Sequence, residues 1–187
     1  MAVRIVNSTI SGNVVAAQAG AVLAYGNVAL ELDNATVSTN VAAPTRNGGI
    51  QISTGVTEPA SASNATPPTL KLVSTVLANN SSTNGDVGTN TTAIPTFGIN
   101  ATSSLIQRIC PTCAIVVAGS GTFIGADPLL GPLGFNGGPT RTQALLAGSP
   151  AINTGSNPLG LMTDQRGPGF PRVVGGAPDI GAYESPF

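Results

Sequence analysis

Ionisable side chains that could bind a ligand gather toward the C-terminus of this chain. Carboxylates and guanidinium groups at this density could hold an anionic ligand or a sugar, or they could fasten irregular coils together through bidentate ion pairs. The sequence leaves both interpretations open and favours ion pairs that hold the coils together. The candidate ligand-binding residues are Asp164, Arg166, Arg172 and Asp179, with Glu184 close by.

The chain contains no histidine. This removes Ser-His-Asp and Cys-His triads, imidazole bases and His-ligated metals. Glycan-cleaving chemistry could still use paired carboxylates, or a carboxylate-bound Ca²⁺ with a basic residue. Acidic residues number only 8, and we interpret the closest pair, Glu31 and Asp33, as solvated surface charge. The sequence therefore predicts no catalytic residue, no metal site and no cofactor.

The two cysteines form a C-x-x-C motif, Cys110 and Cys113. Such a motif can be a redox pair, half a zinc site or a tight structural disulfide. A zinc site needs four ligands, and no further Cys or His exists to complete one. A thioredoxin-like pair would open a helix, and nothing helical follows. We favour a small loop staple or two reduced thiols in a loop.

Composition excludes two classes of partner. The net charge is −1, and only 8% of the residues are charged, against roughly 25% in an average protein. Without a basic patch, nucleic-acid binding lacks its electrostatic driving force. No run reaches the roughly 18 apolar residues of a membrane span. Aromatic residues are also scarce, so only Tyr25 is added as a candidate glycan-contacting residue.

A repeat of 27 residues organises the N-terminal part of the chain. Residues 3–13 (VRIVNSTISGN) and 30–40 (LELDNATVSTN) match in their alternating apolar positions and in two asparagines. A third copy, residues 70–79, fits if the first asparagine is deleted. Strand-like repeats of this length are typical of solenoids, in which each unit buries its apolar face on its neighbours.

Each repeat has a strand, a polar corner, a short second strand and a glycine-led third strand. This predicts an all-β, three-faced parallel β-helix of about five to six rungs with an irregular C-terminal cap. Residues 1–124 form the rungs, with loop insertions near 57–68 and 81–95. Residues 125–187 supply the last rungs and the cap of the same domain, and residues 160–187 are expected to close the solenoid.

The repeat alignment also predicts which residues stack. Arg4, Glu31 and Lys71 should lie in file on one outer face. The asparagines should stack at two corners, because asparagine tolerates the left-handed conformation of a corner. One corner holds Asn7 and Asn34, and the other holds Asn13, Asn40 and Asn79.

Five C-terminal motifs carry a family resemblance. Together with the upstream NSTISGN (residues 7–13), they resemble the C-terminal part of secreted bacterial right-handed parallel β-helix proteins, described as pectate-lyase-like or choice-of-anchor Q domain proteins. The resemblance covers nearly the whole chain and implies a right-handed coil, export and surface display. It carries over no catalytic residues. The motifs are GADPLLGPL (125–133), NGGPT (136–140), LLAGSPAIN (145–153), TDQRG (163–167) and APDIGAYE (177–184).

The expected function is that of a non-enzymatic fragment of a bacterial extracellular or cell-surface protein, with a structural, adhesive or matrix role. A carbohydrate-binding module for a polysaccharide is one alternative, and a fragment of a polysaccharide lyase or glycoside hydrolase is another. Because the chain begins inside a repeat, we expect it to be a piece of something longer. Its first rung, with Val3 and Ile5 uncovered, is expected to support homo-oligomer formation.

Overall fold

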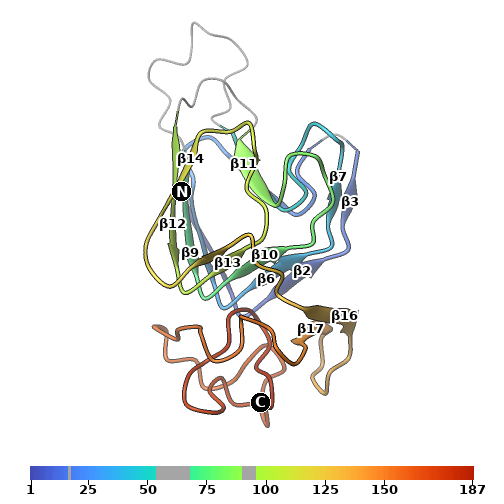
Figure 1. Cartoon of the computed structure of the whole chain (residues 1–187), viewed down its shortest axis with the longest axis vertical. Coiled ribbons are helices and arrows are strands. Elements are labelled where there is room, and N and C mark those ends of the chain that lie inside the picture. Colours follow the sequence, from blue (N-terminus) through green and yellow to red (C-terminus); the bar gives the residue numbers. More distant parts are fainter. Residues whose placement is uncertain (17, 54–67, 90–95) are drawn as a thin grey trace, which may run out of the picture.

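A computed structural model describes residues 1–16, 18–53, 68–89 and 96–187, and shows strands stacked in parallel sheets (Figure 1). Five strands, one per rung, form the first sheet. Val3 lies opposite Leu30, and Ile5 lies opposite Leu32, which confirms the 27-residue repeat. In stacking order the strands are β1 (Ala2–Val6), β5 (Ala29–Asp33), β9 (Thr69–Val73), β12 (Phe97–Thr102) and β14 (Ile115–Ala118).

Two further parallel sheets and one short corner sheet form the other sides of the coil. The second sheet stacks β2 (Thr9–Ser11), β6 (Thr36–Ser38), β10 (Val76–Ala78), β13 (Leu105–Ile106) and β15 (Phe123–Ile124). The third stacks β4 (Val22–Tyr25), β8 (Ile50–Ser53) and β11 (Val87–Thr89). The corner pair is β3 (Val14–Val15) and β7 (Val41–Ala42). The prediction of an all-β parallel β-helix is confirmed.

One hydrophobic core fills the inside of the coil. Because side chains alternate across a strand, every second residue of the first sheet faces inward, and Leu32, Leu72 and Ile99 are fully buried there. Ile50 and Ile52 of the third sheet close the core from the opposite side.

The third repeat stacks without the deletion that the sequence alignment required. Ser74 follows β9 with a φ of 49°, as Asn34 follows β5 with a φ of 48°. The register then continues with Leu77 opposite Val37. The alignment of Val76 with the inward Val37 is therefore wrong, and Val76 faces out of the coil.

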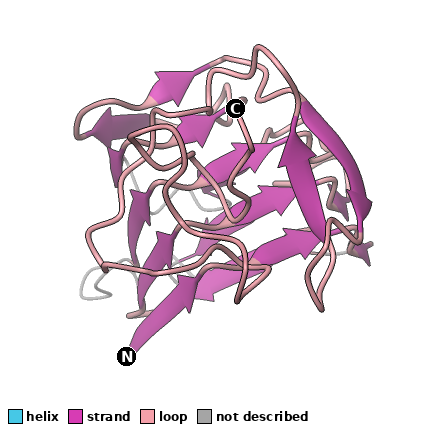
Figure 2. Cartoon of the chain, turned by 90° about the horizontal axis from the view of Figure 1, so that it is seen from below, coloured by secondary structure: helices cyan, strands magenta, loops and turns pink. Residues whose placement is uncertain are grey.

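A second core explains why Val76 faces outward. The C-terminal segment, residues 126–187, lies along the outer side of the second sheet, and Figure 2 shows its loops crossing the stacked strands. It includes an antiparallel hairpin of β16 (Leu130–Gly134) and β17 (Thr142–Leu145). Apolar groups of the segment pack against the outward side chains of β10 and β13. The buried members are Val76, Ala78, Leu105, Leu145, Ala151 and Ile180.

The expectation that residues 160–187 close an end of the solenoid is wrong. Thr163 accepts a hydrogen bond from Asn7 in the first turn, and Gly181 donates one to Ser74 in the third. The segment therefore runs beside several rungs. The second sheet has an apolar outer face, and covering it removes that apolar surface from water.

Both predicted loop insertions fall partly or wholly outside the described residues. Residues 57–67 of the first insertion and residues 90–95 of the second lie there. In the first half of the latter, Ser81 forms a parallel bridge with Val41, and β11 adds a strand to the third sheet.

Candidate functional site

The structure brings the C-terminal charged cluster together and buries it. Asp164, Arg172, Asp179 and Glu184 are each at most 2% exposed, and Arg166 is 8% exposed. Charged groups at this depth are stable only when they are paired and hydrogen-bonded. The partners of each group therefore decide whether any is free to meet a ligand.

Arg166 is held by a carboxylate and by two aromatic rings. Its Nη2 donates to Asp164 Oδ2 at 2.6 Å, and its Nε donates to the same oxygen at 2.9 Å. The guanidinium carbon lies 4.1 Å from the centroid of Phe170 and 3.9 Å from that of Tyr183, so cation–π attraction adds to the ion pair. Nη2 also donates to the carbonyl of Glu184 at 2.6 Å.

Arg172 and Glu184 form the second buried ion pair. Arg172 Nη2 donates to Glu184 Oε2 at 2.7 Å, and the backbone N–H of Val174 donates to Oε1 at 2.9 Å. Burial nonetheless raises the pKa of the Glu184 carboxyl above its ordinary value, against the opposing effects of these donors. Nη1 of Arg172 donates to the carbonyl of Gly181 at 2.8 Å.

Asp179 ties two distant parts of the C-terminal segment to each other. Its Oδ1 accepts from the backbone N–H of Asn153 at 2.7 Å, and its Oδ2 accepts from that of Ser185 at 2.6 Å. Both oxygens of all three carboxylates in the cluster thus accept hydrogen bonds from within the segment. This arrangement is expected of charged groups that hold the coils of the segment together, which is the interpretation that the sequence favours.

The fastened segment docks on the corners of successive rungs. Asn7 Nδ2 donates to the carbonyl of Thr163 at 3.1 Å, and Asn34 Nδ2 donates to that of Ser156 at 3.1 Å. Farther along, the buried hydroxyl of Ser38 donates to Oε1 of Gln143 in β17. The corner asparagines therefore stack in adjacent rungs, as predicted, and also hold the segment.

Beside the cluster lies a shallow surface pocket of about 310 Å³. Its walls are largely apolar and include Phe170, Val174 and Tyr183. Tyr25 does not join this place. It lies at the end of β4 in the third sheet and is 57% exposed, whereas the cluster packs against the second sheet.

A file of charges crosses the outer face of the first sheet, as the repeat alignment predicted. Glu31 Oε1 lies 3.4 Å from Arg4 Nη2 and 2.6 Å from Lys71 Nζ. Arg4 Nε also donates to Asp33 Oδ2 at 2.7 Å, and Asp33 is fully buried. The interpretation of Asp33 as a solvated charge is therefore wrong. A pocket of about 310 Å³ lies along this file.

Replacing Glu31 by lysine should lower the free energy of unfolding. The substitution exchanges two attractive contacts for repulsion between like charges on adjacent strands, and each contact is expected to be worth about 0.2–1 kcal/mol. Urea denaturation in low and high salt measures the effect, with Glu31→Gln as the uncharged control. The loss should shrink in high salt, and a loss that is independent of salt would contradict the electrostatic origin.

A ladder of side-chain amides runs along the other corner. Asn13 Nδ2 donates to Asn40 Oδ1 at 2.8 Å, and Asn40 Nδ2 donates to Asn80 Oδ1 at 2.9 Å. The predicted third member, Asn79, is thus replaced by its neighbour Asn80. The ladder ends at Asp86, whose Oδ1 accepts from Asn80 Nδ2 at 2.9 Å.

Asp86 gives this ladder a pH dependence. Burial raises the pKa of its carboxyl above the ordinary value, although Asn80 and the Arg108 backbone N–H donate to it. The folded state therefore holds the proton more tightly than the unfolded chain. The stability that this group contributes is present at low pH and is lost as the pH rises through its folded-state pKa.

The substitution Asp86→Asn should consequently cost more stability at pH 4 than at pH 7, because asparagine cannot titrate. Denaturant unfolding at both pH values measures the difference. Asp127→Asn, at an exposed aspartate, is the matched control. A cost that grows with rising pH would overturn the assignment.

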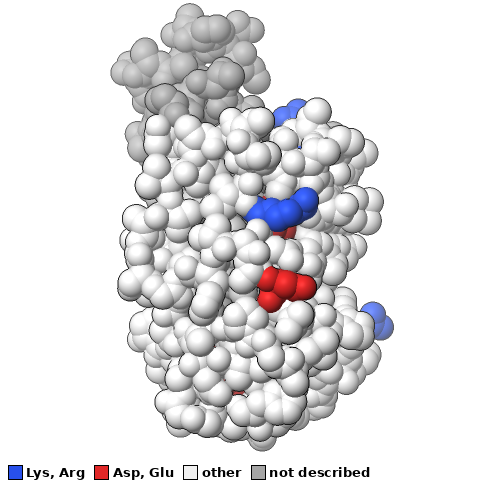
Figure 3. All heavy atoms as spheres, viewed as in Figure 1, with Lys and Arg blue, Asp and Glu red and all other residues white. Residues whose placement is uncertain are grey.

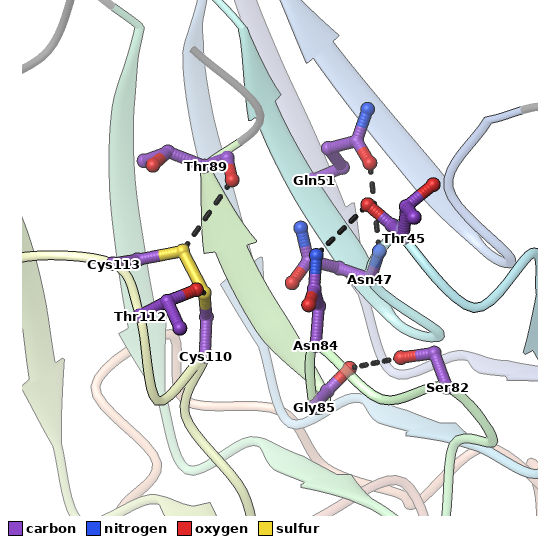
Figure 4. Close-up of a disulfide and its surroundings, with 10 residues drawn as sticks. All are labelled: Thr45, Asn47, Gln51, Ser82, Asn84, Gly85, Thr89, Cys110, Thr112 and Cys113. Atoms are coloured by element: carbon purple, nitrogen blue, oxygen red, sulfur yellow. Dashed lines mark hydrogen bonds between the residues drawn. A yellow bond between two sulfur atoms is a disulfide. The ribbon is translucent and has the colours of Figure 1, made fainter. Parts of the chain in front are cut away.

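The two cysteines are joined in a disulfide beside β11 (Figure 4). The interpretation as a disulfide within a small loop is thus confirmed, and the alternative of two reduced thiols is wrong. Within the described ranges no group of three or more His, Cys, Asp and Glu side chains is placed to hold a metal ion. In the same ranges no helix is long and apolar enough to cross a membrane.

Charged groups are few on the face shown in Figure 3. The sequence interpretation missed Asn80 and Asp86, which continue the amide ladder, and Gln143, which bonds to the second sheet.

Comparison of the chain with protein-family models, with curated proteins and with solved structures finds no match.

Proposed function

We propose that this β-helix is a structural or adhesive element displayed outside a bacterial cell. The main support is that the carboxylate oxygens of the buried charged cluster all accept hydrogen bonds from within the C-terminal segment. Carboxylates paired in this way fasten the C-terminal segment and are not free to act as an acid or a base. The C-terminal motifs that resemble secreted choice-of-anchor Q domain proteins support the extracellular location.

An experiment on intact cells tests this proposal. Antibodies against the chain should label unpermeabilised cells of the encoding bacterium, and external protease should remove the label. Deleting the coding sequence should reduce attachment to surfaces or cell aggregation, and re-expression should restore it. Label that appears only after permeabilisation would refute the location, and unchanged attachment and aggregation would refute the role.

Glycan binding is the second candidate, and the pocket on the first sheet favours it. Arg4, Glu31 and Lys71 line a hollow of about 310 Å³ that offers both donors and acceptors to sugar hydroxyls. A glycan array of uronate and neutral polysaccharides, with Glu31→Lys as the variant, tests this. Binding that the variant abolishes would support a carbohydrate-binding module.

The same array, read for reducing-end release, tests the lyase or hydrolase alternative. Such an enzyme is expected to line one groove with at least three acidic groups. The two pockets described above each hold a single carboxylate, Glu31 in one and Glu184 in the other. We therefore expect no release from any polysaccharide.

A further inference from the structure

The disulfide closes a very small loop that the backbone already holds in place. Cys110 and Cys113 are 3 residues apart, with a Cα–Cα distance of 5.3 Å. The N–H of Cys110 donates to the Val87 carbonyl at 2.9 Å, and that of Cys113 donates to the Cys110 carbonyl at 3.3 Å. Because a disulfide stabilises a fold least when its loop is short, a purely structural role gains little from this bond.

A buried amide without a partner faces this disulfide. Asn47 is fully buried, and neither its Nδ2 nor its Oδ1 has a hydrogen-bond partner among the described residues. A Cβ on Gly88 would collide with both Asn47 Oδ1 and Cys110 Cβ, so the two side chains approach the same point across β11. Figure 4 shows the amide end of Asn47 pointing toward the disulfide. Leaving such a group unpaired is costly, which suggests a second state in which it is paired.

The two cysteines differ in exposure and in surroundings. Cys110 is 2% exposed, whereas Cys113 is partly exposed at the surface. The Thr112 hydroxyl lies 3.6 Å from Cys110 Sγ. An incoming thiolate can therefore reach Cys113, and the sulfur displaced from the bond is Cys110. A thiolate at Cys110 would accept a hydrogen bond from the Thr112 hydroxyl. After a half-turn of the Asn47 amide, which puts Nδ2 where Oδ1 now lies nearest Cys110, it would accept a second one from Asn47.

We propose that Cys110–Cys113 is a thiol–disulfide exchange site for an external dithiol, with Asn47 and Thr112 as positioning residues that stabilise the reduced Cys110 sulfur. One thiolate of the dithiol attacks Cys113 Sγ, and the Cys110–Cys113 bond breaks to release the Cys110 thiolate. The second thiol of the partner then attacks the mixed disulfide and releases Cys113. Two electrons and two protons pass to the chain, and the partner leaves as a disulfide.

Reduction leaves the rung intact in this scheme. The backbone bonds of Cys110 and Cys113 do not involve sulfur, and Ile109 keeps its parallel bridge to Val87. The reduced chain should therefore melt at nearly the same temperature as the oxidised chain. Slow hydrogen exchange in β11 and β14 should also persist.

The test equilibrates the full chain in buffers with graded ratios of reduced to oxidised glutathione, and separately with dithiothreitol. Thiols are trapped with a maleimide and counted by intact mass. We expect the disulfide to be reduced at ratios that leave ordinary structural disulfides oxidised. Dithiothreitol should act faster than glutathione at equal thiol concentration, because its second thiol resolves the mixed disulfide within the same molecule.

Variants separate the positioning role from a structural one. Asn47→Ala and Thr112→Val should each shift the equilibrium toward the disulfide by about tenfold or more, since each removes a hydrogen bond to a charged sulfur. Asn47→Asp keeps the volume but places a carboxylate there, and it should shift the equilibrium in the same direction. Thr89→Val is the matched control, because the contact of Thr89 with Cys113 Sγ is made by its backbone carbonyl, which the substitution keeps.

A spectroscopic readout completes the design. In Cys113→Ala, the thiol pKa of Cys110 is followed by thiolate absorbance, and adding Asn47→Ala should raise it, because the thiolate then loses a donor. A disulfide that resists reduction in every glutathione buffer would overturn the proposal. So would Asn47 variants that lower the melting temperature yet leave the redox equilibrium and the thiol pKa unchanged.

Discussion

Replacing Arg172 by methionine should destabilise the chain by about 3–5 kcal/mol, because it removes one partner of a buried ion pair and leaves the other charge unpaired. Glu184 would keep the backbone N–H groups of Val174 and Asp179 but would lose its cation. The carbonyl of Gly181 would lose its donor as well. Urea denaturation followed by circular dichroism measures the loss.

Two further variants locate the origin of that loss. Arg141 is exposed and stacks on Phe135 at 5.1 Å, so Arg141→Met should change stability by less than about 0.5 kcal/mol. Adding Glu184→Leu to Arg172→Met should recover part of the loss, since no unpaired charge then remains buried. If the double variant is less stable than the sum of the two single effects predicts, the ion pair is not the cause.

The same buried contacts explain what the sequence could predict of this site and what it could not. The charges in the C-terminal segment are conspicuous in a chain with 8% charged residues, and they do meet in space. These charges could not predict the position of the C-terminal segment, because ion pairs within a segment do not depend on which sheet the segment covers. The informative residue was Val76, an apolar side chain on the outer face of a strand, which requires a covering layer.

The rungs were the more predictable part, because period-2 alternation fixes which side chains face inward. Leu30, Leu32 and Leu70 lie in the register that the repeats predict. The error in the third repeat came from demanding an asparagine at each corner. The corner needs a residue that tolerates a positive φ, and serine fills it twice, at Ser74 and Ser103. Matching the apolar side chains first would have placed Asn80 in the ladder.

The amide ladder is the feature whose loss we expect to matter most for stacking. Asn40 Nδ2 donates to the carbonyl of Ile10 at 3.0 Å as well as to Asn80, and Asn40 Oδ1 accepts from both the backbone and the side chain of Asn13. One side chain thus joins three rungs. Because Asn40 is fully buried, water cannot replace these bonds.

Asn40→Leu should therefore lower the free energy of unfolding by about 1–3 kcal/mol, since it takes a donor from the Ile10 carbonyl and from the buried Asn80 Oδ1 and puts a larger apolar side chain among polar groups. Chemical denaturation gives the magnitude, and hydrogen exchange should show faster opening of β2 and β6 in particular. Asn100→Leu is the matched control, because Asn100 is an exposed asparagine of β12 that lies outside the ladder. If the two variants melt alike, the ladder does not hold the rungs together, and corner geometry alone determines the stacking.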